Sequence, residues 1–349
     1  MPTRPSPLLP ALLVVAACGQ DPGDDAGTDS GITTAASAAS TSSSGSDATS
    51  GGTDSGTAGP TTDASATEPI YDVGAPDTDP TGTEPADECT NVDILFVIDD
   101  SASMADNQVS LINSFSGFVA GIKQQLSLAE SYHVGVVTSD AYNFNEPGCR
   151  QIGDLVTQTG GGNSSDAACA PFTSGKRYMD DSEPALTEKF ACAAKVGTYG
   201  SDDERMMRAM LDALKPGKSA AGQCNDGFSR LDSLLVIVLI TDEDDVPENC
   251  DPVTDLCDTY GSGGNKQEWY DELSNYRAHI AENVVVLSLF GKGPVSECGA
   301  VINSKIFGFT NLFGDNGYNG DVCAESYDEF FAAALPIIDV ACENFVPPT

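Results

Sequence analysis

Residues Val92 to Ile98 read VDILFVI, a nearly continuous apolar run of strand length that ends at Asp99. Such a run is typical of a strand that is buried on both faces of a parallel sheet. A helical stretch follows, because large apolar residues recur at spacings of three and four and so occupy one face. These residues are Leu111, Ile112, Phe115, Phe118, Val119, Ile122 and Leu126. The pattern predicts a strand-to-helix unit.

The same alternation continues along the chain. Further strands are expected at 132–138, 234–240 and 284–289, and further helices at 183–195, 202–214, 266–281 and 326–342, the last interrupted near Pro336. The Gly- and Cys-rich segment 143–175 is expected to be a long loop stapled by disulfides. Together these elements predict the α/β class, with a doubly wound, mainly parallel sheet covered by helices on both faces. Ligands of such sheets bind beyond the carboxyl ends of the strands.

The composition changes sharply near residue 88. Residues 19–88 consist mostly of Ser, Thr, Gly, Asp, Ala and Pro, and large apolar residues are nearly absent. Such a segment cannot bury enough surface to offset its chain entropy, so we expect a disordered linker. The globular part is a single domain, 89–349, and the linker would act as a spacer for it.

Residues 1–18 have the features of an export signal. Arg4 precedes an apolar stretch, Leu8 to Ala17, that is too short to span a bilayer. The segment ends in VAAC, which resembles the lipobox of bacterial lipoproteins, and this resemblance implies that Cys18 becomes the lipidated N-terminus. The alternative is an ordinary cleaved signal with an incidental Cys. The resemblance implies a lipid-anchored protein of the cell envelope, and Gly19 after the Cys implies the outer membrane or cell surface.

The chain has eleven Cys, and removing Cys18 leaves an even ten in the globular part. Export favours disulfides, and with only two His, His133 and His279, a zinc site is a poor competitor. Spacing does not determine the connectivity. Cys250 with Cys257, and Cys298 with Cys323, are the local pairings to test first.

The formal net charge of -37 excludes some partners. Nucleic acid binding depends on clustered Lys and Arg, so nucleic acid is not expected as a partner. An anionic bilayer surface is disfavoured for the same reason. Contact with a membrane is therefore expected through the lipid anchor only.

Two predicted strands end in acids at the edge where a ligand site is expected. Asp99, Ser101 and Ser103 form a D-x-S-x-S pattern after the first strand, and Asp242 follows the strand at 234–240. This arrangement resembles the metal-ion-dependent adhesion site (MIDAS) of von Willebrand factor type A domains. Thr198, before the helix expected at 202, resembles the family's Thr ligand. The resemblance covers about residues 90 to 342, and Cys-rich insertions at 149–192 and 250–257 depart from the family pattern.

The resemblance implies a divalent cation, Mg²⁺ or Ca²⁺, with Mn²⁺ as a third candidate. Such cations prefer oxygen ligands, and hydroxyls fill coordination positions without neutralising the ion. Ser101, Ser103 and Thr198 would touch the cation, whereas Asp99 and Asp242 would act through bound water. An open position would then bind a carboxylate of a protein ligand. The alternatives are that Ser101 or Ser103 caps the following helix and that Thr198 is a turn hydroxyl.

The segment 242–258 carries further acids, among them Glu243, Asp244 and Asp245. They form either a second calcium site in a loop closed by Cys250 and Cys257 or a solvated acidic surface. They lack the regular alternation and the Gly of an EF-hand, which favours the solvated surface.

No enzymatic activity is expected. The chain has no G-x-S-x-G motif, and the hydroxyl-rich ligand set lacks the His or clustered carboxylates that activate water. The sequence predicts a surface-anchored lipoprotein that binds a divalent cation and, through it, an acidic group of a protein ligand, in adhesion or envelope interaction. The alternative is a structural envelope protein with a stabilising metal, and a metal-dependent hydrolase is less favoured.

Overall fold

A computed structural model describes residues 89–125, 129–201, 203–245, 261–293 and 298–348. Four expectations from the sequence concern residues outside these ranges. They are the signal segment 1–18 with Cys18, the linker 19–88, the pairing of Cys250 with Cys257, and a calcium site in the acidic segment 242–258, of which only the first residues are described.

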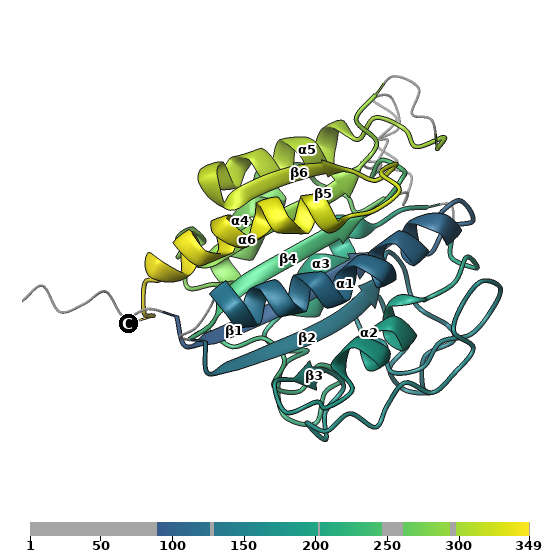
Figure 1. The fold of residues 1–349 in the computed structure, drawn as a ribbon, viewed down its shortest axis with the longest axis horizontal. Helices are drawn as coiled ribbons and strands as arrows, with labels where there is room; N and C mark the ends of the chain where they lie inside the picture. The colour runs from purple at the N-terminus through teal and green to yellow at the C-terminus, as the bar shows by residue number, and fades with distance from the viewer. Residues whose placement is uncertain (1–88, 126–128, 202, 246–260, 294–297, 349) are drawn as a thin grey trace, which may run out of the picture. The chain divides into compact units, whose positions relative to one another are not determined.

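A six-stranded sheet forms the centre of the described domain (Figure 1), in the order β3-β2-β1-β4-β5-β6. The strands are β1 (Asn91–Ile98), β2 (Ser131–Thr138), β3 (Met179–Asp180), β4 (Leu234–Ile240), β5 (Val284–Phe290) and β6 (Gly317–Asp321). All neighbouring strands are parallel except β3, which runs antiparallel to β2. The predicted doubly wound, mainly parallel α/β fold is confirmed.

Helices cover both faces of the sheet. One face packs against α1 (Ala105–Gln125), α2 (Leu186–Ala194) and α6 (Asp328–Glu343), and α1 and α6 cross in front of the strands in Figure 1. The other face packs against α3 (Met206–Leu214), α4 (Lys266–Tyr276) and α5 (Ser304–Thr310). Two short 3-10 helices, η1 (Ala281–Asn283) and η2 (Asn311–Asn316), precede β5 and β6.

The sequence of β1 explains why it lies in the middle of these layers. Its side chains alternate between the two faces, as in any strand. The Phe96 ring meets the Phe190 ring on the α1 face at a centroid distance of 4.7 Å. Leu95 and Val97 belong to the cluster on the α3 face. Both faces of β1 are buried in apolar side chains, so its run of apolar residues is unbroken except at Asp93.

Several helix ends differ from the sequence predictions for identifiable reasons. Helix α2 begins at Leu186 and not at Glu183, because Glu183 precedes a proline, which disfavours helical backbone at that position. Helix α3 begins at Met206 and not at 202, because Arg205 has the non-helical backbone angles φ -123° and ψ 47°. Helix α4 ends at Tyr276, so that His279 lies not in the helix but in the left-handed turn after it, with a φ of 63.

Helix α6 is continuous, whereas an interruption near Pro336 was predicted. Proline removes the hydrogen bond to the carbonyl four residues earlier. Here both Pro336 and that residue, Ala332, lie on the exposed side of the helix, where water can satisfy the carbonyl. Helix α5 and strand β6 were not predicted. The β6 sequence, GYNGD, has no apolar run, because an edge strand is only partly buried.

Four disulfides join described residues: Cys89–Cys342, Cys149–Cys224, Cys169–Cys192 and Cys298–Cys323. The predicted pairing of Cys298 with Cys323 is confirmed. Two of the others fasten the segment 143–175 to later parts of the chain, as expected for a stapled loop. Disulfides in this number indicate an extracytoplasmic location. Across the described ranges, no helix is both long and apolar enough to cross a bilayer.

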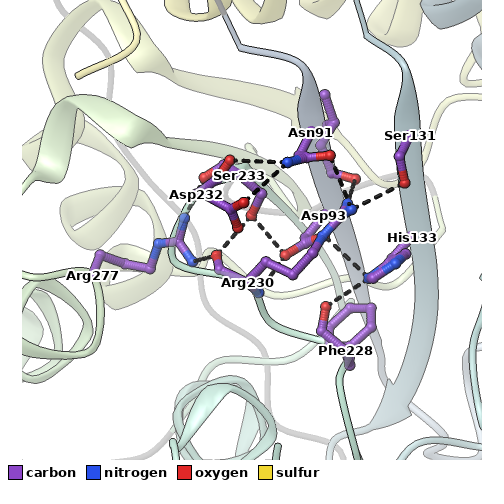
Figure 2. Close-up of polar contacts among 10 residues, drawn as sticks. Asn91, Asp93, Ser131, His133, Phe228, Arg230, Asp232, Ser233 and Arg277 are labelled. Atoms are coloured by element: carbon purple, nitrogen blue, oxygen red, sulfur yellow. Dashed lines mark hydrogen bonds and ion pairs between the residues drawn. The ribbon is translucent and has the colours of Figure 1, made fainter. Parts of the chain in front are cut away.

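The amino ends of the central strands are closed by a buried polar network around Asp93 (Figure 2). Arg230 places Nη2 at 2.7 Å and Nε at 2.8 Å from Asp93 Oδ1, and the Ser233 hydroxyl donates to Asp93 Oδ2 at 2.6 Å. His133 Nδ1 lies 2.9 Å from the Phe228 carbonyl and 3.3 Å from Asp93 Oδ1. Asp93 is therefore paired and hydrogen-bonded within the domain.

Candidate functional site

The segments after β1 and β4 meet at the carboxyl edge of the sheet. The two strands are parallel neighbours with Ile98 opposite Ile240. Directly beyond them, the Asp99 amide donates to the Ile240 carbonyl at 3.0 Å. Asp99 and Asp242 are 143 positions apart in the sequence. They nevertheless follow the ends of two neighbouring strands, at the same edge of the sheet.

Asp99 is held in place by two hydrogen bonds. Its Oδ1 accepts from the Ser101 amide at 2.7 Å, and its Oδ2 accepts from the Thr241 hydroxyl at 2.7 Å. Burial raises the pKa of Asp99 to about 6, although the bonds from Thr241 and Ser101 oppose that rise. The Asp242 carboxylate lies near enough to raise the pKa further. The site thus concentrates negative charge in a buried position.

The two serines of the motif lie together. The Ser101 and Ser103 hydroxyl oxygens are 3.3 Å apart, with Ser101 buried and Ser103 exposed. Both precede α1, in the turn where the Met104 amide donates to the Ser101 carbonyl. The turn presents a pair of hydroxyls at the end of β1, next to the fixed Asp99 carboxylate.

Asp242 has a buried oxygen without a partner. Its Oδ1 makes no hydrogen bond with any described residue, although the side chain is almost completely buried. Burial raises the pKa of Asp242, and the Ser103 hydroxyl opposes that rise. Buried carboxylate oxygens are normally bonded, so an orphaned one in a native site needs an explanation such as an ion.

Thr198 lies beside this group, but its hydroxyl is engaged elsewhere. Its Oγ1 accepts from Asn163 Nδ2 at 2.9 Å and donates to the Gly162 carbonyl at 3.4 Å. Both partners belong to the Cys-rich insertion. The structure therefore brings together Asp99, Ser101, Ser103 and Asp242, and it points the Thr198 hydroxyl toward the insertion.

Gln108 ties the Thr198 loop to the end of β1. Its Nε2 donates to the Asp99 carbonyl at 3.1 Å and to the Gly197 carbonyl at 2.9 Å, and its Oε1 accepts from the Gly197 amide at 3.1 Å. The side chain is buried in α1. Gln108 was not predicted from the sequence, because a single polar residue on a helix carries no signal of its contacts.

Glu204 is a second residue of this edge that was not predicted from the sequence. It precedes α3, it is 1% exposed, and neither carboxylate oxygen has a hydrogen-bond partner in the described chain. Burial, with Asp99 as the next cause, raises its pKa to about 10. Other acids at this edge include Asp99, Asp100 and Asp242. Glu204 stands in a polar segment of ordinary composition, so no pattern distinguishes it in the sequence.

The donor set determines what kind of ion the site suits. No group of three or more His, Cys, Asp or Glu in the described ranges is arranged to hold a metal ion. A cation here would depend on hydroxyl and water oxygens together with carboxylates. Oxygen-only donors suit hard cations such as Mg²⁺ and Ca²⁺, and the orphaned Asp242 oxygen fits such an ion.

The chain resembles several solved structures at low similarity. Proximal thread matrix protein 1 from the mussel byssus has a TM-score of 0.37 and 13% identity, with 74% of this chain and 49% of that chain covered. The manganese-loaded Plasmodium vivax TRAP protein has a TM-score of 0.34 and 16% identity, with 72% of this chain and 74% of that chain covered. The human COPII-coat protein Sec24c has a TM-score of 0.32 and 11% identity, with 72% of this chain and 33% of that chain covered.

The chain thus spans about half of the mussel protein and a third of Sec24c. No protein-family profile matches the chain, and no curated protein matches it by sequence. At these TM-scores and identities the likeness assigns neither a cation nor a ligand to this chain.

Proposed function

We propose that this chain is a surface-anchored lipoprotein whose folded domain binds a divalent cation, Mg²⁺ or Ca²⁺, and through it an acidic group of a protein ligand. The observation that carries the proposal is the buried Asp242 Oδ1, which lacks a hydrogen-bond partner in the described chain while the Ser103 hydroxyl lies near the same carboxylate. A bound cation, directly or through its coordinated water, gives that oxygen a partner.

Each residue has a distinct role in the proposed site. Ser101 and Ser103 supply hydroxyl ligands, and Asp99 and Asp242 orient coordinated water. Hydroxyl ligands leave the positive charge of the cation intact, so an open coordination position attracts a carboxylate. Thr198 can coordinate the cation only if its hydroxyl breaks its hydrogen bonds to Asn163 and Gly162.

We propose a binding module and not an enzyme. The two histidines, the residues most often used as general bases, stand away from the site. His133 takes part in the Asp93 network at the amino edge of the sheet, and His279 lies in the turn after α4. The hydroxyls and carboxylates at the carboxyl edge are donors for a hard cation, which supports the binding module.

Isothermal titration calorimetry on the full chain tests the cation site. We expect Mg²⁺ or Ca²⁺ binding by the wild type, and loss of that binding in Asp99→Ala and in the double variant Ser101→Ala with Ser103→Ala. Ser116→Ala, which removes an exposed hydroxyl from α1, serves as the matched control and should bind normally. Unchanged binding in the site variants, shown to be folded by circular dichroism, would contradict the assignment.

Affinity capture from envelope extracts tests the ligand. The full chain is used as bait with cation present, with a chelator, and with the Asp99→Ala variant. A protein that is captured only with cation and only by the wild type supports the binding module. If the chelator and the Asp99→Ala substitution leave the captured proteins unchanged, the result favours the alternative. That alternative is a structural envelope protein whose metal stabilises the fold.

The lipid anchor is tested separately. Cys18→Ser should move the protein from the membrane fraction to the soluble fraction, and mass spectrometry of the wild type should find a lipidated N-terminus at Cys18. If the wild-type protein is instead found in the soluble fraction and is cleaved at a position other than Cys18, the result supports an ordinary cleaved export signal.

A further inference from the structure

We propose that Glu204 is a direct ligand of the cation site and that it makes the site selective for Ca²⁺ over Mg²⁺. This inference rests on the proposed cation site and adds to it a carboxylate that the D-x-S-x-S pattern does not contain. Its basis is the position, burial and missing bonds of one side chain.

The backbone before Glu204 is fastened to the end of β1. The Gly200 amide donates to the Asp100 carbonyl at 2.7 Å, and the Ser201 amide donates to Asp140 Oδ2 at 3.0 Å. A Cβ at Gly200 would lie 2.6 Å from the Asp100 carbonyl oxygen, so only glycine permits this close approach. The anchored segment carries Glu204 into the edge of the sheet, before α3 begins.

The Glu204 carboxyl lies among other acids. Asp99 and Asp100 are both close enough to disfavour a negative charge on it. No described Lys or Arg forms an ion pair with Asp99, Asp100 or Glu204, and the adjacent Arg205 is directed to Asp203, at 3.7 Å. Buried carboxylates are retained in folded proteins when they are paired or when they coordinate metals.

Hydrogen bonding does not account for the Glu204 side chain. Both oxygens are buried, and neither has a hydrogen-bond partner in the described chain. The Ser139 hydroxyl lies close enough to the Glu204 carboxyl to affect its charge, but its single hydrogen is donated to Asp100 Oδ1 at 3.2 Å. Protonation does not complete the bonding, because a carboxylic acid hydroxyl also requires an acceptor. A cation satisfies both oxygens at once.

Two free oxygens on one carboxylate favour calcium. Ca²⁺ accepts six to eight oxygen ligands and commonly takes a carboxylate in bidentate fashion, whereas Mg²⁺ requires near-octahedral geometry and keeps several waters. A bidentate Glu204 raises the direct protein oxygens from the two serine hydroxyls to four, and coordinated water and a carboxylate of the protein ligand complete the six to eight that suit Ca²⁺.

Calorimetry with CaCl₂ and with MgCl₂ on the full chain tests this inference through Glu204→Gln. We expect the Ca²⁺ affinity to fall at least tenfold and the Mg²⁺ affinity to fall less than threefold. With a chelator present, the Tm of the variant should equal or exceed that of the wild type, because Gln removes a buried acid from an acidic cluster. A merely structural Glu204 would instead lower the Tm in chelator.

Glu183→Gln is the matched control. Glu183 is also buried, but its Oε2 accepts from the Thr173 amide at 2.8 Å, away from the cation site. This control should lower the Tm and leave both cation affinities unchanged. A Ca²⁺ affinity of Glu204→Gln within twofold of the wild type overturns the inference, and so does an equal loss for Ca²⁺ and Mg²⁺.

The double variant Ser101→Ala with Ser103→Ala separates this inference from the proposed function. If the double variant loses cation binding and Glu204→Gln keeps it, the proposed site stands and the role of Glu204 is refuted. If Glu204→Gln loses Ca²⁺ binding and the double variant keeps it, the role of Glu204 stands and the serine ligands are refuted. If the wild type binds neither cation, both are refuted.

Discussion

Thr241 donates its hydroxyl hydrogen to Asp99 Oδ2 at 2.7 Å and so joins the end of β4 to the end of β1. The Thr241 hydroxyl oxygen also accepts from the Glu243 amide at 3.0 Å. Thr241 therefore fixes the orientation of the Asp99 carboxylate and the start of the turn that carries Asp242. Neither effect requires Thr241 to touch a cation.

Thr241→Val should weaken cation binding by about 10- to 100-fold, because partners that orient metal ligands typically contribute this much to affinity. Calorimetric titration of the full chain with Ca²⁺ measures the change. Thr241→Ser keeps the hydroxyl and should bind within about threefold of the wild type. Equal affinities of the Val and Ser variants would show that Asp99 needs no orientation by Thr241.

Arg230→Met should destabilise the domain by about 3–5 kcal/mol, because it leaves the fully buried Asp93 without its charged partner. Urea unfolding followed by circular dichroism measures the loss. Adding Asp93→Asn to the same chain should recover part of it. Arg208→Met removes the more exposed pair with Asp212 and should cost under about 1 kcal/mol, so a similar loss in both single variants would contradict the argument.

Removal of the Cys89–Cys342 disulfide should cost more stability than removal of Cys169–Cys192. The first closes a sequence separation of 253 and the second a separation of 23. Loop-closure entropy then assigns about 5 kcal/mol to the first and about 3 kcal/mol to the second. Paired Cys→Ala variants compared by urea unfolding test this order. The reverse order would mean that native packing, and not chain entropy, determines the difference.

The sequence predicts the sheet well because the central strands are buried on both faces. The apolar runs at β1, β4 and β5 are compatible with few structures other than buried strands. Because β1 and β4 are parallel neighbours, Asp99 and Asp242 then lie at the same edge of the sheet. Strand β6 was missed, since an edge strand is only partly buried and its sequence GYNGD shows no periodicity. Periodicity reports burial, so it identifies central elements and not edges.

The candidate site was predictable only where it follows a strand. Thr198 was assigned from its position before a helix, yet its hydroxyl bonds to Asn163, a residue of an insertion whose path no local pattern predicts. Glu204 was placed inside a helix that in fact begins at Met206. The non-helical backbone at Arg205 separates Glu204 from that helix.

The metal-free domain should lose stability as the pH rises from about 4 to about 7, and Asp245 should contribute to that loss. Asp245 is buried and accepts from the Met207 amide at 2.8 Å and from the Ser262 hydroxyl, and burial raises its pKa to about 6 from 3.8. The folded state therefore binds a proton more tightly than the unfolded state. The contribution to stability is fully present below 3.8 and is lost as the pH rises through about 6.

Asp245→Asn removes this titration, so the difference in unfolding free energy between wild type and variant should change by up to about 3 kcal/mol between pH 4 and pH 7. Urea unfolding in chelator at several pH values gives that difference. Asp226→Asn should act in the opposite direction, because the Gly222 amide and Lys176 lower the pKa of Asp226 in the folded state. A pH-independent difference for Asp245→Asn would mean that its hydrogen bonds to Met207 and Ser262 fully offset the cost of burying its charge.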